Sequence, residues 1–122
     1  MCIRDRNVIF IDGVAKTEMK SVLKAANAAV IPLRKLDLFL GAIPSKIFEN
    51  LAMKIPVLLA VDGEARELFV KQGNCAIYVE PENAKDLAEK VKHLFNDKAL
   101  QEQMGQAGRA YAVCLLYASR CV

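Results

Sequence analysis

The residues best suited to chemistry form one run at the end of a long loop, Gly41-Ala42-Ile43-Pro44-Ser45-Lys46. Ser45 is a favourable N-cap for a helix that carries Ile47 and Leu51. Free backbone N–H groups at such a helix start, the positive end of its dipole and the Lys46 ammonium together favour an anion such as phosphate. The same spacing also fits an ordinary capped helix that follows a long loop and binds no ligand. No Walker or Gly-x-Gly-x-x-Gly pattern is present, so the run is not a standard nucleotide loop.

Glu49 lies one turn past Ser45, on the side of the expected helix opposite Ile47 and Leu51. A carboxylate in this position can accept hydrogen bonds from a pair of sugar hydroxyls. The alternative is a solvated residue that suits the helix dipole, and spacing alone favours that alternative.

The elements around this run alternate between strands and helices. Continuous apolar stretches predict strands at residues 7–11, 28–33, 56–61 and 75–79. Helical spacing predicts helices at residues 19–26, 45–52, 64–72, 83–95 and 100–111. This order predicts a Rossmann-like α/β domain in which a parallel sheet is the middle of three layers. Ligands bind such sheets at the carboxyl ends of the strands, where Gly13, Gly41, Asp62 and Gly63 are expected.

For two of the predicted helices, the apolar spacing indicates which side chains face the core. The first is expected to bury a stripe that includes Met19 and Val22. The fourth is expected to be capped by Asn83, with Asp86 in the capping-box position. Its inward-facing residues are expected to be Leu87, Val91, Leu94 and Phe95.

The two ends of the chain differ from its interior. Back-translation of residues 1–6 and 114–122 yields one inverted repeat, which resembles a translated sequencing adapter. We therefore interpret residues 7–113 as an incomplete domain from a longer protein. The ends hold three arginines and one aspartate, so without them the formal net charge of +3 falls by two. This loss of basic character argues against a basic nucleic-acid face. Cys75 is then the only cysteine, which argues against disulfides and a zinc site. No signal peptide is recognisable, so a cytoplasmic location is expected.

Residues 41–58 resemble the donor-binding signature of retaining GT-B glycosyltransferases of the group 1, family-four type. They are similar to the motif of the bacterial cell-surface polysaccharide group, Gly-Ala-x-Pro-Ser-Lys…Glu…Ala…Pro-Val. Weaker similarity extends over residues 7–112. The resemblance implies that the chain is part of the C-terminal half of a GT-B fold. It also implies a parent enzyme that transfers a sugar from a nucleoside-diphosphate-sugar to a glycan or lipid-linked acceptor, with retention and without an obligatory metal or other cofactor.

The resemblance also assigns roles to residues of this sequence. It implies that Glu49 holds the ribose of the donor and that Gly13 and Val14 lie beside the base. The backbone that faces the donor diphosphate would be that of Gly41, Ala42, Ile43, Pro44 and Ser45, next to Lys46. The first glutamate of the family's Glu-x₇-Glu motif has no counterpart, because Leu40 and Gly41 occupy its place. No residue is therefore assigned to the transferred sugar, and the catalytic residue stays unknown.

The acceptor is expected to bind an N-terminal domain that lies outside this chain, so the fragment alone is expected to be inactive. Peripheral association of the parent with the inner face of a membrane is compatible with a lipid-linked acceptor. Two alternatives share the fold. One is a GT-B sugar-nucleotide epimerase, and the other is a non-catalytic, receiver-like module that binds a partner through its strand-end loops.

Overall fold

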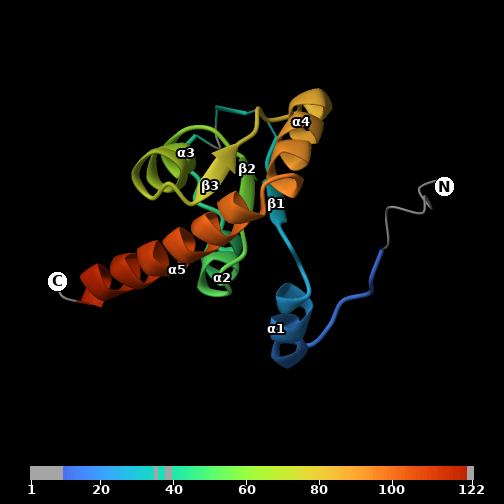
Figure 1. Cartoon of the computed structure of the whole chain (residues 1–122). Helices are drawn as coiled ribbons and strands as arrows, with labels where there is room; N and C mark the ends of the chain where they lie inside the picture. Colours follow the sequence, from blue (N-terminus) through green and yellow to red (C-terminus); the bar gives the residue numbers. More distant parts are fainter. Residues whose placement is uncertain (1–9, 35, 38–39, 121–122) are drawn as a thin grey trace.

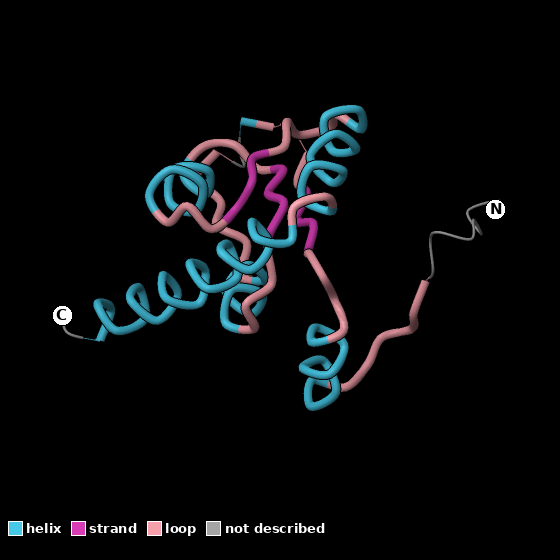
Figure 2. Tube along the Cα trace, viewed as in Figure 1, coloured by secondary structure: helices cyan, strands magenta, loops and turns pink. Residues whose placement is uncertain are grey.

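The computed structural model describes residues 10–34, 36–37 and 40–120 (Figure 1). Three strands form a parallel sheet in the order β1 (Ala29–Pro32), β2 (Val57–Ala60) and β3 (Ala76–Tyr78). The helices of the described residues are α1 (Lys16–Lys24), α2 (Lys46–Ala52), α3 (Glu64–Arg66), the π-helical η2 (Glu67–Gln72), α4 (Ala84–Phe95) and α5 (Lys98–Arg120). Helices and strands alternate along the trace (Figure 2), which confirms the predicted Rossmann-like α/β class.

Strand β2 is the centre of the molecule because it pairs with β1 on one side and β3 on the other. In the register of the sheet, Val57 of β2 lies opposite Ala29 of β1 and Ala76 of β3. Every residue from 55 to 61 is buried. A continuous apolar run is what a strand covered on both faces requires, and this is why alternation is absent from the sequence here.

Two clusters of buried side chains cover the two faces of the sheet. On one face, residues of β2 pack with α2, α3, η2 and the C-terminal half of α5. Phe69 is fully buried there, with its ring edge-on to Phe48 at 5.7 Å and to Tyr111 at 6.0 Å between centroids. On the other face, Leu58 packs with Leu94 of α4 and other buried residues. The sheet is therefore the middle of three layers, as predicted.

The predicted first strand does not join the sheet in the described part of the chain. Phe10 and Ile11 lie outside any element and are 74% and 72% exposed, while residues 7–9 of that prediction lie outside the described residues. Helix α1 forms as predicted but buries no residue, so the expected burial of Met19 and Val22 is wrong. Figure 1 shows α1 below the sheet and apart from the other helices.

Helix α4 buries less of its apolar stripe than predicted. Leu94 is buried and Leu87 is half-buried, whereas Val91 and Phe95 are exposed. The physical reason is that β1 is an edge strand of the described sheet, with Val30 itself 45% exposed, so no surface lies opposite this side of α4.

Helix α5 holds α2 against the sheet through a close backbone contact. A Cβ added at Gly105 would overlap the carbonyl oxygen of Lys54, just past the end of α2. One turn further on, the Arg109 guanidinium donates to the carbonyl oxygen of Ala52 over 2.8 Å. This bond satisfies one of the carbonyl groups that a helix end leaves open. The helix runs unbroken to Arg120, past the boundary expected after residue 113, and the domain limits stay a prediction.

Gly105→Ala tests whether this close approach limits stability. The new methyl group would push α5 away from Lys54, and we expect the free energy of unfolding to fall by about 1–2 kcal/mol, measured by urea denaturation. The better helix propensity of alanine works in the opposite direction and is worth about 1 kcal/mol at most. Gln106→Ala, on the exposed side of the same helix, is the control and should change stability by less than about 0.5 kcal/mol. Equal stability of the two variants would contradict the close packing of α5 on α2.

Candidate functional site

The run singled out in the sequence forms an open turn that leads into α2. Gly41, Ile43, Ser45 and Lys46 are exposed, and a Cβ added at Gly41 would meet no atom within 4 Å. Among the described residues, none accepts a hydrogen bond from the backbone N–H groups of residues 41–43, 45 and 46. The turn therefore holds five backbone N–H groups that have no partner among the described residues.

Ser45 precedes α2, but it does not act as the predicted side-chain cap. Its backbone is already helical, with φ −64° and ψ −26°, and its hydroxyl makes no capping hydrogen bond. A side-chain cap needs an extended backbone at that residue. The helix begins instead with two short-range bonds, from Ile47 N–H to Pro44 O over 3.2 Å and from Phe48 N–H to Ser45 O over 3.3 Å. The Ile47 and Phe48 N–H groups are therefore bonded without a side-chain cap, and the Lys46 N–H at the start of α2 has no partner among the described residues.

Glu49 points away from the core, as predicted. It lies in the first turn of α2 and is exposed, while Ile47 and Leu51 on the opposite side are 0% and 1% exposed. Its neighbour Asn50 was missed in the sequence analysis. Asn50 is buried, and its Nδ2 donates to the Lys46 carbonyl over 2.9 Å, whereas its Oδ1 has no partner among the described residues. Asn50 thus links its side chain to the first residue of α2, one helical turn before it.

A second turn, Asp62-Gly63, lies at the carboxyl end of β2 and contacts the start of the turn at Gly41. The Glu64 N–H donates to the Leu40 carbonyl over 2.7 Å. Gly63 has φ +89°, and a Cβ at this position would overlap that same carbonyl group. Only glycine takes this conformation and permits this approach without strain. The structure therefore brings Leu40, the residue before Gly41, against Gly63 and Glu64, whereas the sequence analysis had placed Gly41 and Gly63 only at the same edge of the sheet.

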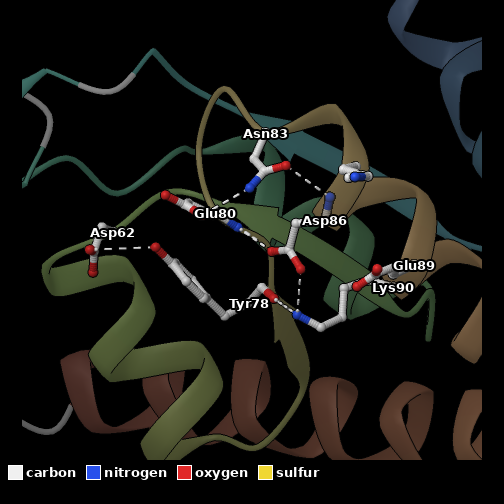
Figure 3. Close-up of a pocket in the computed structure, with 8 residues that line it drawn as sticks. Asp62, Tyr78, Glu80, Asn83, Asp86, Glu89 and Lys90 are labelled. Carbon is white, nitrogen blue, oxygen red and sulfur yellow. Dashed lines mark hydrogen bonds and ion pairs between the residues drawn. The ribbon is translucent and has the colours of Figure 1, made fainter.

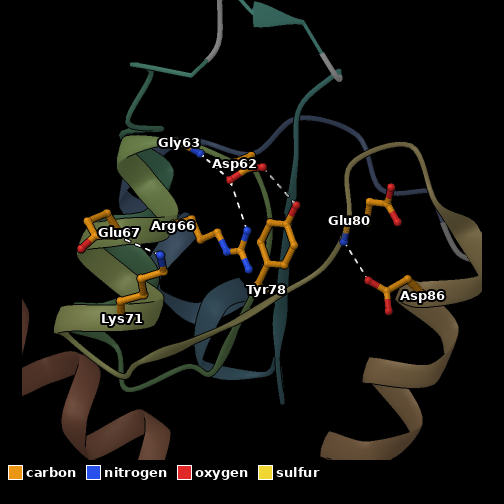
Figure 4. Close-up of polar contacts among 8 residues, drawn as sticks. All are labelled: Asp62, Gly63, Arg66, Glu67, Lys71, Tyr78, Glu80 and Asp86. Atoms are coloured by element: carbon orange, nitrogen blue, oxygen red, sulfur yellow. Dashed lines mark hydrogen bonds and ion pairs between the residues drawn. The ribbon is translucent and has the colours of Figure 1, made fainter.

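Asp62 is also the centre of a small polar cluster that the sequence analysis missed (Figure 4). Its Oδ1 accepts from the Gly63 N–H over 2.7 Å and from the Arg66 guanidinium over 3.5 Å. The Gly63 hydrogen bond is the main reason that the pKa of Asp62 lies below its ordinary value. The Arg66 guanidinium lies 3.8 Å from the centroid of the Tyr78 ring. Burial is the main cause of the raised pKa of Tyr78, and the Asp62 charge adds to it. The i, i+4 spacing of Asp62 and Arg66 was the feature of the sequence that could have indicated their ion pair.

Gly13 and Val14 are not brought to this site. They precede α1, and Figure 1 shows that helix and the chain leading into it at the end of the sheet opposite α3 and α4. The described arrangement therefore does not place Gly13 and Val14 beside the turn at Gly41, and their assignment to the nucleobase stays a prediction.

Among the described residues, no group of three or more His, Cys, Asp and Glu side chains is placed to hold a metal ion. None of the helices in the described part of the chain is long and apolar enough to cross a membrane. His93 is exposed on α4 and is not among the residues that form the turn at Gly41.

The comparisons with known proteins identify the class of protein that carries this site. The family profile described as "Glycosyl transferases group 1" matches residues 4–111. The chain therefore belongs to the group 1 glycosyl transferases, a family whose activity is transfer of a glycosyl group from a donor to an acceptor. No curated protein and no solved structure matches the chain at a significant level. The family match favours the transferase over the epimerase and receiver-like alternatives.

Gly63→Ala tests whether the Asp62-Gly63 turn positions the turn at Gly41. A methyl group at Gly63 would meet the Leu40 carbonyl and would strain a φ of +89°. We expect the free energy of unfolding to fall by about 1–3 kcal/mol and the amide resonances of residues 40–43 to move. Gly13→Ala is the matched control, because a Cβ there would meet nothing within 4 Å. If Gly63→Ala left the residue 40–43 amides unmoved, the link between the two turns would be wrong.

Proposed function

We propose that the turn of residues 41–46 binds the diphosphate of a nucleoside-diphosphate-sugar, and that Glu49 accepts hydrogen bonds from the ribose hydroxyls. The observation that supports this most is the set of five unpartnered backbone N–H groups in the open turn. Such donors at a helix start bind phosphate oxygens readily, and the exposed Lys46 adds a positive charge. Glu49, one turn along α2, is exposed and on the side away from the core, so its carboxylate is free to accept from a diol.

The same donors suit the chemistry of sugar transfer. Negative charge grows on the diphosphate as the bond to the sugar breaks, and fixed N–H groups stabilise that charge without reorganisation. The open turn thus acts on the leaving group. We assign no residue to the transferred sugar, because Leu40 and Gly41 stand where the family's first motif glutamate would be.

The parent protein we infer is a retaining GT-B hexosyltransferase that works without a metal or other cofactor. Its acceptor would be a glycan or lipid-linked molecule held by a separate N-terminal domain. The similarity of residues 41–58 to the bacterial cell-surface polysaccharide group supports this proposal. The same similarity is compatible with work in the cytoplasm, with peripheral contact to the membrane where the acceptor is lipid-linked.

Glu49→Gln tests the proposed ribose contact in the 122-residue chain. The amide keeps the size of the side chain but loses the charged acceptor, so we expect about ten-fold weaker binding of the preferred nucleoside diphosphate. The measurement is calorimetric titration with the uridine, guanosine and adenosine diphosphates. Glu102→Gln, an exposed glutamate on α5, is the control and should leave the affinity unchanged.

A second variant, Lys46→Ala, tests the proposed phosphate contact separately from the proposed ribose contact of Glu49. Its affinity should fall for a nucleoside diphosphate but not for the nucleoside alone, since Lys46 is proposed to act on the phosphates. If Glu49→Gln bound every diphosphate as tightly as the unchanged chain, Glu49 would have no place in the donor site.

A further inference from the structure

Helix α4 carries a second apolar stripe, which stays exposed in the described part of the chain. Its members follow one another at intervals of four, three and four residues: Ala84, Ala88, Val91 and Phe95. Val91 is 42% exposed and Phe95 is 77% exposed. Residues with this spacing lie on one side of a helix. The exposed stripe is therefore distinct from the side of α4 that packs on the sheet, where Leu94 is buried.

The surface beside the exposed stripe is apolar as well. A groove of about 260 Å³ lies between α4 and β1, and Val30, Leu58 and Val91 are among the residues that line it. Strand β1 is at the edge of the described sheet. Since Ala29 donates to the Pro56 carbonyl of the neighbouring segment, the next peptide groups, those of Val30, point toward the open edge. An apolar surface next to an open strand edge is a place where another chain attaches readily.

Polar contacts hold α4 on the rest of the domain (Figure 3). Asn83 accepts from the Asp86 N–H over 3.0 Å, as the helix cap that the sequence predicts. Asp86 does not close the predicted capping box, because its Oδ2 accepts from the Glu80 N–H over 2.8 Å. Lys90 Nζ donates to the Tyr78 carbonyl and to Asp86 Oδ1, each over 3.2 Å. The helix is thus already fixed when it presents its exposed stripe, so little further ordering opposes association.

The exposed stripe is complementary to itself. Its intervals read the same in both directions, so two copies of α4 that run antiparallel about a two-fold axis bring their stripes into register. Phe95 of one copy then lies opposite Ala84 of the other, and Val91 lies opposite Ala88. Each large side chain meets a small one, which lets two helices approach closely and fill the space between them. A parallel pair would instead set Phe95 against Phe95.

We propose that a second copy of this chain covers the exposed stripe, so that the protein forms a two-fold symmetric dimer with the two α4 helices packed antiparallel. The exposed Phe10 and Ile11 of the same chain are a poorer fit. Neighbouring side chains of an extended segment point to opposite sides, so only one of the two can face the stripe. None of the stripe residues belongs to the turn of residues 41–46 or to α2, so the inference does not rest on the proposed function.

Sedimentation equilibrium of the 122-residue chain tests the proposal. Four side chains from each copy make a small interface, so we expect a dissociation constant on the order of 10–100 μM. Between about 5 and 500 μM protein, the average mass should rise from that of a monomer toward that of a dimer. A chain that stays monomeric over this range would overturn the proposal.

Charge substitutions test the antiparallel register. Ala88→Glu sets a carboxylate opposite Val91 of the second copy, and Val91→Lys sets an ammonium group opposite Ala88. Each variant alone should dimerise at least about ten-fold more weakly, because the charge loses water against an apolar side chain. In an equimolar mixture of the two variants, one contact pairs the carboxylate with the ammonium group and the other keeps Val91 against Ala88. The mixture should therefore dimerise more strongly than either variant alone.

His93→Glu is the matched control, because it adds a carboxylate to an exposed position on the opposite side of α4. It should dimerise like the unchanged chain, and urea unfolding of all the variants checks that the fold is kept. If Ala88→Glu and Val91→Lys dimerised as the control does, the interface would be wrong. Single variants that weaken the dimer without recovery in the mixture would contradict the antiparallel register. A dimer that Phe10→Ser abolishes and Ala88→Glu leaves intact would place the contact on the N-terminal segment and overturn the proposal.

Discussion

The complete burial of β2 is the constraint on which the rest of the structure depends. Residues 57–61 are covered by β1 and β3 along their sides and by helices on both faces. Burial of such apolar surface is the main favourable term in folding. Because the strand is held so firmly, its carboxyl end delivers Asp62 and Gly63 to a defined place. Gly63 then lies close against the Leu40 carbonyl, and Asp62 accepts hydrogen bonds from the Gly63 N–H and from Arg66.

Packing, and not periodicity, decided which apolar stripes became buried. Met19 and Val22 of α1 and Val91 and Phe95 of α4 have helical spacing as regular as that of Leu87 and Leu94. Val91 and Phe95 are exposed because β1 is at the edge of the described sheet and offers no surface beyond Val30, whereas Met19 and Val22 lie on a helix that buries no residue. The opposite case is Gly105, which is unremarkable in the sequence. It lets α5 approach Lys54 closely and so helps to hold the helix that carries Glu49.

The sequence by itself determined the strands at 28–33, 56–61 and 75–79, the helices between and after them, and the outward side of Glu49. These follow from local periodicity and from the burial of contiguous apolar residues. Only the tertiary structure decided that Leu40 meets Gly63 and that Arg66 stacks on Tyr78. Such contacts join residues distant in the chain, and a one-dimensional pattern does not encode which loops meet at a sheet edge. The Ser45 cap failed for a related reason, because its backbone angles are set by the turn before it.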